Sequence, residues 1–132
     1  MGHSYRDLLA WQKAKSFAVE IYRATERFPP DELYGLRTQL RRAAVSVASN
    51  IAEGQGRSTP GEFSQFLGTA RGSLLEISTQ LEISRDLGFI GDPRYEQLDS
   101  RLRDVLGLVN LLTSAINKQR RDRATRSETL KP

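Results

Sequence analysis

Apolar residues recur every three or four positions along this chain, which is the period of an amphipathic helix. Proline, glycine and acidic residues separate four such stretches, so we predict helices at about residues 6–27, 32–54, 59–87 and 93–118. No stretch alternates apolar and polar residues as a half-buried strand would. The short connections favour antiparallel neighbours. The pattern therefore predicts an all-α fold, an antiparallel up-down-up-down four-helix bundle over residues 1–117.

Each predicted helix has one apolar stripe that we assign to the core of the bundle. The boundaries are also marked, since Thr59 before Pro60 is a typical N-cap and Gly88 is a typical residue just after a helix. The four stripes comprise Trp11, Ala14, Ala18, Ile21, Thr25 and Phe28; Leu36, Leu40, Ala43, Val47 and Ile51; Phe63, Phe66, Ala70, Leu74, Ile77 and Leu81; and Tyr95, Leu98, Leu102, Val105, Val109, Leu112 and Ile116.

The second predicted helix contains an unusual stretch, RRAAVSVASNIAEGQGR at residues 41–57. At about 100° per residue, it divides into a core strip, a strip of small residues with Ala44 and Ala48, and a polar strip with Ser46, Asn50 and Glu53. A helix on the surface of a monomer needs only one apolar strip, so the second one suggests a further partner. We interpret the polar strip as hydrogen-bonding groups that set helix register, either within one bundle or between bundles.

Two further features of the middle helices leave alternatives open. Glu53 lies near the C-terminus of its helix, where the dipole disfavours an acid, so we expect a cationic or backbone-donor partner, with Arg57 and Arg71 as the candidate bases. Gly68 and Gly72 lie one turn apart inside the third helix, where each glycine costs about 1 kcal/mol relative to alanine. Close approach of another helix would compensate, within the bundle or between subunits.

Composition narrows the function classes. The chain has no cysteine, and its one histidine is His3, so thiolate, histidine-based and di-iron chemistry have no residues to use. A carboxylate-only magnesium site at Glu53, Glu62 or Glu76 is the remaining enzyme hypothesis. We expect a non-enzymatic protein without cofactor or metal. No apolar run is long enough for a membrane span and no signal peptide is evident, so we expect a cytoplasmic location.

The net charge of +4 is concentrated at the end of the chain. From Lys118 onward there are six bases and two acids, whereas residues 1–117 contain equal numbers of each. We expect residues 118–132 to form a disordered basic tail, which is either a nucleic-acid contact or a solubilising extension. The bases we select there as nucleic-acid-binding candidates are Lys118, Arg120, Arg121 and Arg123.

The chain resembles a known bacterial family. The residues that carry the resemblance are LLAWQKAKSFAVEIYRATERFP, ELYGLRTQLRRAAVSVASNIAEGQGR and FLGTARGSLLEISTQLEISRDLGFI, and above all SVASNIAEG at 46–54 followed by ARGSLLE at 70–76. These motifs are similar to those of the four-helix-bundle proteins encoded in intervening sequences of 23S ribosomal RNA genes. More distantly, the chain is similar to the accessory protein of diversity-generating retroelements, which partners a reverse transcriptase and RNA.

The resemblance implies a homopentamer without known enzymatic activity that binds nucleic acid. The first hypothesis is therefore an oligomeric binding protein for RNA or a ribonucleoprotein, and the alternative is an adaptor for a reverse transcriptase or another nucleic-acid enzyme. Repetition of a basic patch in an oligomer would strengthen phosphate binding. On the body of the bundle, the candidate bases are Arg37, Arg41, Arg42, Arg57 and Arg71.

Overall fold

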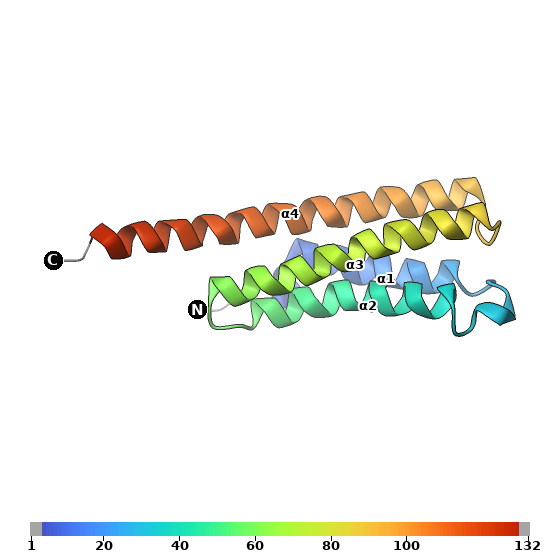
Figure 1. Ribbon diagram of the computed structural model, residues 1–132, viewed down its shortest axis with the longest axis horizontal. Coiled ribbons are helices and arrows are strands. Elements are labelled where there is room, and N and C mark those ends of the chain that lie inside the picture. Colours follow the sequence, from blue (N-terminus) through green and yellow to red (C-terminus); the bar gives the residue numbers. More distant parts are fainter. Residues whose placement is uncertain (1–3, 130–132) are drawn as a thin grey trace.

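The computed structural model describes residues 4–129, and over this range the all-α bundle is confirmed. Four helices run up and down along one axis (Figure 1). Each helix packs against two neighbours, so that α2 lies between α1 and α3 and α4 lies between α3 and α1. Short 3-10 turns at Tyr5–Asp7 and Pro30–Glu32 precede α1 and α2. The helices are α1 (Leu9–Ala24), α2 (Leu36–Gln55), α3 (Pro60–Asp86) and α4 (Asp92–Thr129).

The core of the bundle largely follows the predicted stripes. On α3 it includes Leu67, which the predicted stripe omits, whereas Phe66 is only half buried. The predicted stripe of the first helix is buried at Ala14, Ile21, Thr25 and Phe28 but not at Trp11 and Ala18. In α1 the buried residues are Ala10, Ala14, Phe17 and Ile21, whereas Trp11 is only half buried. The buried face therefore includes Ala10 and Phe17 next to the predicted stripe, a small rotation that places Phe17 in the core. The displaced Trp11 lies at the edge of the bundle.

The turn between α2 and α3 brings these two helices unusually close together. A Cβ atom added to Gly54 would lie 2.8 Å from Phe63 Cδ1 and 2.8 Å from Phe66 Cβ. Glycine at this buried position is therefore required for close packing. As predicted, Thr59 caps α3, because its hydroxyl oxygen accepts a hydrogen bond from the Glu62 backbone N–H at 3.2 Å.

The turn between α3 and α4 also follows the sequence prediction. Gly88 has a φ of 77°, a left-handed conformation that favours glycine. The Phe89 N–H donates to the Ser84 carbonyl at 2.8 Å, and the Gly88 N–H donates to the Arg85 carbonyl at 2.9 Å. These two bonds form a Schellman motif that ends α3. The Phe89 ring then packs against Phe28 with centroids 5.4 Å apart, closing this end of the bundle.

The predicted disorder of the basic tail is wrong for residues 118–129. These residues continue α4 as a helix that ends at Thr129, and it projects beyond the other helices (Figure 1). The segment KQRRDRATRSET contains no glycine or proline and many good helix formers, and it extends a helix that is already nucleated. The rest of the predicted tail, at 130–132, lies outside the described residues.

The predicted starts of the first two helices are too early. The chain from Tyr5 to Asp7 forms a 3-10 turn before α1, and Pro30–Glu32 forms another before α2. The Leu36 backbone N–H at the start of α2 donates to the Glu32 carboxylate at 2.8 Å, so this acid caps α2 from outside the helix. None of the helices described is long and apolar enough to cross a membrane.

Candidate functional site

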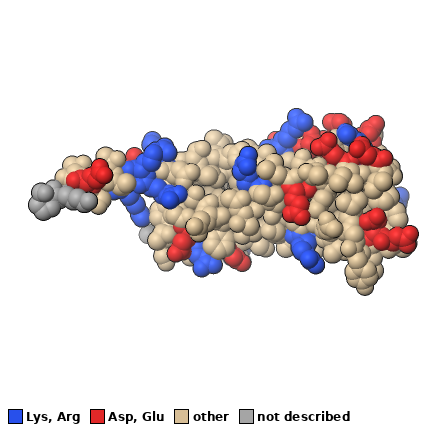
Figure 2. Space-filling model, viewed as in Figure 1, with Lys and Arg blue, Asp and Glu red and all other residues tan. Residues whose placement is uncertain are grey.

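The projecting end of α4 is the most basic part of the molecule. Ser64 Oγ lies 3.1 Å from Asn117 Oδ1, which aligns the start of α3 with this level of α4. Residues 122–129 therefore extend about 12 Å past the start of α3, at about 1.5 Å per residue. Residues 118–129 hold five bases and two acids. Within the part of the chain that the structure describes, none of these bases forms an ion pair, and all are exposed (Figure 2).

The register of α4 places arginine where the core stripe would continue. The stripe reaches Ile116, and further steps of four and three residues lead to Arg120 and Arg123. The Arg120 guanidinium lies over the first turn of α3, since its Nε would be 3.9 Å from a Cβ atom at Gly61. Positive charge is thus placed beside the positive end of the α3 dipole. This end of the bundle is suited to an anionic partner, with only Glu62 opposing it in that turn.

Arg57 lies at the same end, in the turn between α2 and α3. Its guanidinium stacks over the Phe66 ring at 4.6 Å from the centroid, which holds it in place without neutralising it. The structure therefore brings five of the nine predicted nucleic-acid candidates to one end of the bundle. These five are Arg57, Lys118, Arg120, Arg121 and Arg123, and we call them, with Arg126, the basic end.

The other four candidates lie elsewhere and do not form one patch with the basic end. Arg41 joins α2 to α1, donating to Thr25 Oγ1 at 2.8 Å and to the Tyr22 carbonyl at 3.0 Å. This partly buried arginine has a structural role. Arg37 lies in the first turn of α2, far from the basic end, and Arg42 lines a small cleft with Tyr22. Arg71 is exposed midway along α3.

The polar strip of α2 lies inside the bundle, against α3. Ser73 Oγ and Ser46 Oγ are 3.1 Å apart, and Asn50 Nδ2 donates to Ser46 Oγ at 3.0 Å and to the Ser46 carbonyl at 2.8 Å. Further along, Gln80 Nε2 donates to Gln39 Oε1 at 3.3 Å. The Ser46–Ser73 bond joins α2 to α3 within one bundle, whereas Asn50 bonds back to Ser46 on its own helix. Sequence reasoning missed Ser73 and Gln80, which lie on the side of α3 that faces α2.

Glu53 does not share in this network. It is exposed, and among residues 4–129 it has no ion pair with Arg57, Arg71 or any other base, so the expected pairing is wrong. Nor do three histidine or acidic side chains gather at one metal-sized site in the described range. The magnesium hypothesis for Glu53, Glu62 and Glu76 therefore has no support from the geometry.

The small-residue strip of α2 divides into a buried part and an open part. Ala44 is fully buried in the core, whereas Ala48 lines a groove of about 770 Å³ between α1 and α2. Trp11, displaced from the predicted core, forms another wall of this groove. We call it the α1–α2 groove; its lining residues that matter below are Trp11, Lys15, Val19, Tyr22, Arg23, Val45, Ala48 and Ser49.

Gly68 and Gly72 lie on the outer face of α3. A Cβ atom added at either position would meet no atom within 4 Å, so neither glycine serves close packing within the bundle. Of the two interpretations left open by the sequence, packing inside the bundle is thereby wrong for this chain. The contact between subunits stays a prediction.

Comparison with known proteins bears on these surfaces. A model of the 23S rRNA-intervening sequence protein family matches residues 6–111. The chain belongs to this family. The match includes SVASNIAEG at 46–54 and both middle helices, and it ends before the basic part of α4. Family membership therefore covers the bundle, whereas the projecting arginines are a feature of this chain outside the matched range.

A solved structure supports the same fold. The chain is similar to a protein of unknown function from the S23 ribosomal protein family of Bacteroides thetaiotaomicron, with a TM-score of 0.72 and 20% identity. The alignment covers 80% of this chain and 98% of that one. No curated protein matches the chain. The family and its structural relative thus establish a four-helix architecture for this member.

Proposed function

We propose that this protein is a non-enzymatic, oligomeric binding protein of the cytoplasm, which contacts RNA or a ribonucleoprotein through its basic end. The observation that carries the proposal is the projecting end of α4, where five bases face solvent without an ion pair. Unpaired arginines on a helix that stands clear of the bundle can approach phosphates from several sides. Arg57, held over Phe66, adds a preoriented guanidinium beside them.

Oligomerisation is part of the proposal. The resemblance to the intervening-sequence proteins implies a homopentamer, and five copies would repeat the basic end five times. Light scattering tests this, since a pentamer has five times the chain mass of 14.9 kDa. A monomeric mass at the highest soluble concentration would contradict it.

Salt titration of RNA binding tests the basic end. We expect a labelled hairpin RNA to bind at low salt, and the logarithm of its binding constant should fall linearly with the logarithm of the salt concentration. Changing Arg121, Arg123 and Arg126 together to glutamine should reduce the magnitude of that slope by about 2 to 3, at about 0.7 to 0.9 per phosphate contact.

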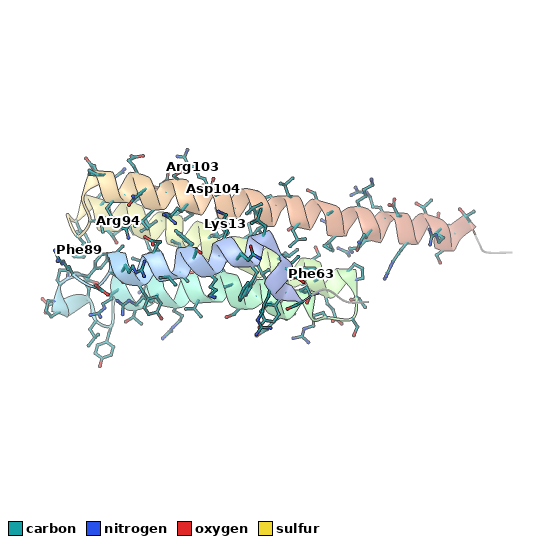
Figure 3. The ribbon with its side chains drawn as sticks, turned by 180° about the vertical axis from the view of Figure 1, so that it is seen from behind. Lys13, Phe63, Phe89, Arg94, Arg103 and Asp104 are labelled. Atoms are coloured by element: carbon teal, nitrogen blue, oxygen red, sulfur yellow. The ribbon has the colours of Figure 1, made fainter. Side chains whose placement is uncertain are left out.

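A matched control changes three exposed bases away from the basic end, Lys13, Arg27 and Arg103, to glutamine and lowers the net charge equally. Lys13 and Arg103 are far from the projecting segment (Figure 3). We expect this control to keep most of the slope. Absence of binding at low salt would contradict the proposed function, and equal losses in the two variants would contradict the assignment to the basic end.

The alternative is an adaptor for a reverse transcriptase or another nucleic-acid enzyme. One observation favours it, an exposed apolar patch where the start of α1 meets α4, formed around Leu9, Leu108 and Leu111. Leu111 is 69% exposed. Coexpression with a polymerase encoded beside the gene tests this alternative. Copurification that Leu111→Glu abolishes would support it, and failure to copurify would contradict it.

A further inference from the structure

The α1–α2 groove is an apolar surface that the bundle leaves open. Val19, Tyr22 and Val45 are 43%, 42% and 44% exposed, although all three are large apolar side chains. Every charged residue that lines the groove is basic, namely Lys15 and Arg23. Arg41 and Arg42 line the adjoining cleft, which shares Tyr22 and Val45 with the groove. Apolar floor and basic margin together fit an apolar helix face that carries acids on its flanks.

Such a helix face is present on the same chain. Leu75 and Ile83, each 43% exposed, lie with Gly68 and Gly72 on the outer face of α3, opposite its core stripe. Glu76 and Glu82 flank this strip on its two sides, and both are exposed. The two glycines leave open space above the helix. We call this surface the outer α3 strip.

We infer that the outer α3 strip of one copy docks into the α1–α2 groove of a second copy. The groove supplies an apolar floor with Lys15 and Arg23 along it and Arg42 in the adjoining cleft, and the strip supplies apolar residues with Glu76 and Glu82 beside them. Gly68 and Gly72 then allow the incoming backbone to come close to Ala48 and Ser49, as small residues do between packed helices.

Charge also sets the direction of the docked helix. Arg23, Arg41 and Arg42 lie at the end of the groove near Tyr22. Arg23 also pairs with Glu20 at 3.5 Å and Arg41 is bonded to α1, so exposed Arg42 is the main base that this end offers to a partner. The acids Glu76 and Glu82 belong to the later part of the strip. Matching these ends makes the incoming α3 run antiparallel to α2. Gly72 then lies near Ser49, and Leu75 lies near Val45. As a result, all subunits of the assembly point in the same direction along one common axis.

The contact joins two different surfaces, so it is heterologous and uses each surface once per copy. A heterologous contact that closes on itself makes a ring. This inference rests on the part of the proposed function that makes the protein an oligomer, and it is independent of RNA binding. Loss of RNA binding by an intact ring would refute the proposed RNA function alone, and the crosslinks below test the contact alone.

Crosslinking tests the contact directly, because the chain has no cysteine. Single variants Ser49→Cys and Gly72→Cys are purified, mixed under conditions that exchange subunits, and treated with a short bismaleimide. We expect a crosslinked dimer in the mixture and little in either variant alone. Val45→Cys mixed with Leu75→Cys provides a second pair, and Ser49→Cys mixed with Arg103→Cys is the negative control.

Several results would overturn the inference. A dimer from Ser49→Cys alone would show groove-to-groove pairing, and an oligomer in which neither mixed pair crosslinks would show that other surfaces join the subunits. A monomer by light scattering would leave nothing to dock.

A second measurement replaces exposed apolar residues with glutamate and follows the mass. Val45→Glu and Leu75→Glu should each dissociate the assembly while circular dichroism retains its helical signal. Leu111→Glu, on a leucine that is more exposed than Val45 or Leu75 and lies outside both surfaces, should leave the mass unchanged. Dissociation by Leu111→Glu, with no effect of the other two, would overturn the inference.

Discussion

The two sides of α2 differ in how completely the fold uses them. Toward α3, the helices approach until Gly54 lies against Phe63 and Phe66, and Ser46 is hydrogen-bonded to Ser73. Toward α1, packing is less extensive, and Ala48 lines an open groove. The difference shows that one helix can be fixed in its bundle by one side while the other side stays available to a partner. The predictions that follow test this contrast.

The largest expected effect is at the closest contact between α2 and α3. Gly54→Ala places a Cβ atom 2.8 Å from two phenylalanine atoms. Overpacking of this kind lowers the free energy of unfolding by about 1 to 3 kcal/mol. Urea unfolding at constant protein concentration measures it. Gly56→Ala is the control, because its Cβ atom would meet nothing nearer than 3.6 Å. Equal stability of the two variants would mean that the helices are not held at this distance.

The hydrogen bond between Ser46 and Ser73 is expected to contribute less to stability, and it allows the two sides of α2 to be compared. Ser46→Ala removes a hydroxyl that lies 3.1 Å from Ser73 Oγ and accepts a bond from Asn50, and we expect a loss of about 1 kcal/mol. Ser49→Ala, on the open side, should change the unfolding free energy of the isolated bundle much less. A larger loss for Ser49→Ala than for Ser46→Ala would reverse the assignment of the two sides.

The outer α3 strip is expected to respond with the opposite sign. Gly72→Ala adds a methyl group in open space and removes the flexibility of a glycine inside a helix, so the bundle should gain about 0.5 to 1 kcal/mol. Thermal unfolding of the dissociated Val45→Glu background measures this gain without a subunit contact. A loss of stability in that background would show that the glycine packs within the bundle.

The smallest effect concerns an ion pair that joins α1 to α4. Arg94 Nη2 donates to Glu20 Oε2 at 2.9 Å, and this hydrogen bond holds the pKa of Glu20 below its ordinary value. A lowered folded-state pKa stabilises the fold above the unfolded pKa, and this contribution is lost as pH falls through the folded value.

Arg94→Gln should therefore cost about 0.5 to 1 kcal/mol at neutral pH, an amount typical of a partly exposed pair. The difference between the variant and the original protein should shrink as the pH falls from neutral through the lowered folded-state pKa of Glu20, where this carboxylate becomes protonated. Urea unfolding of both proteins at neutral pH and at acidic pH measures this difference. A difference that is unchanged at low pH would assign the effect of Arg94 to packing instead.

The basic end and the groove differ in how far the sequence could anticipate them. The arginines after Lys118 were selected from charge alone, but their helical arrangement was not, because composition indicated a disordered tail. One wall of the groove was predicted, because Ala48 belongs to the small-residue strip of α2 that suggested a further partner. Its other wall was missed, because Trp11 and Ala18 have the same spacing as core residues and were assigned to the core.

By itself, the sequence determined the four helices, most of their core residues, the caps at Thr59 and Gly88, and the family. These features depend on residues close together in the chain, whose periodicity and backbone preferences act locally. Only the tertiary structure decided that α1 buries Phe17 rather than Trp11, that Ser46 pairs with Ser73, that Arg41 is bound to α1, and that Gly72 faces outward. These outcomes depend on the rotation of one helix against another, which is set by the packing of all four helices together.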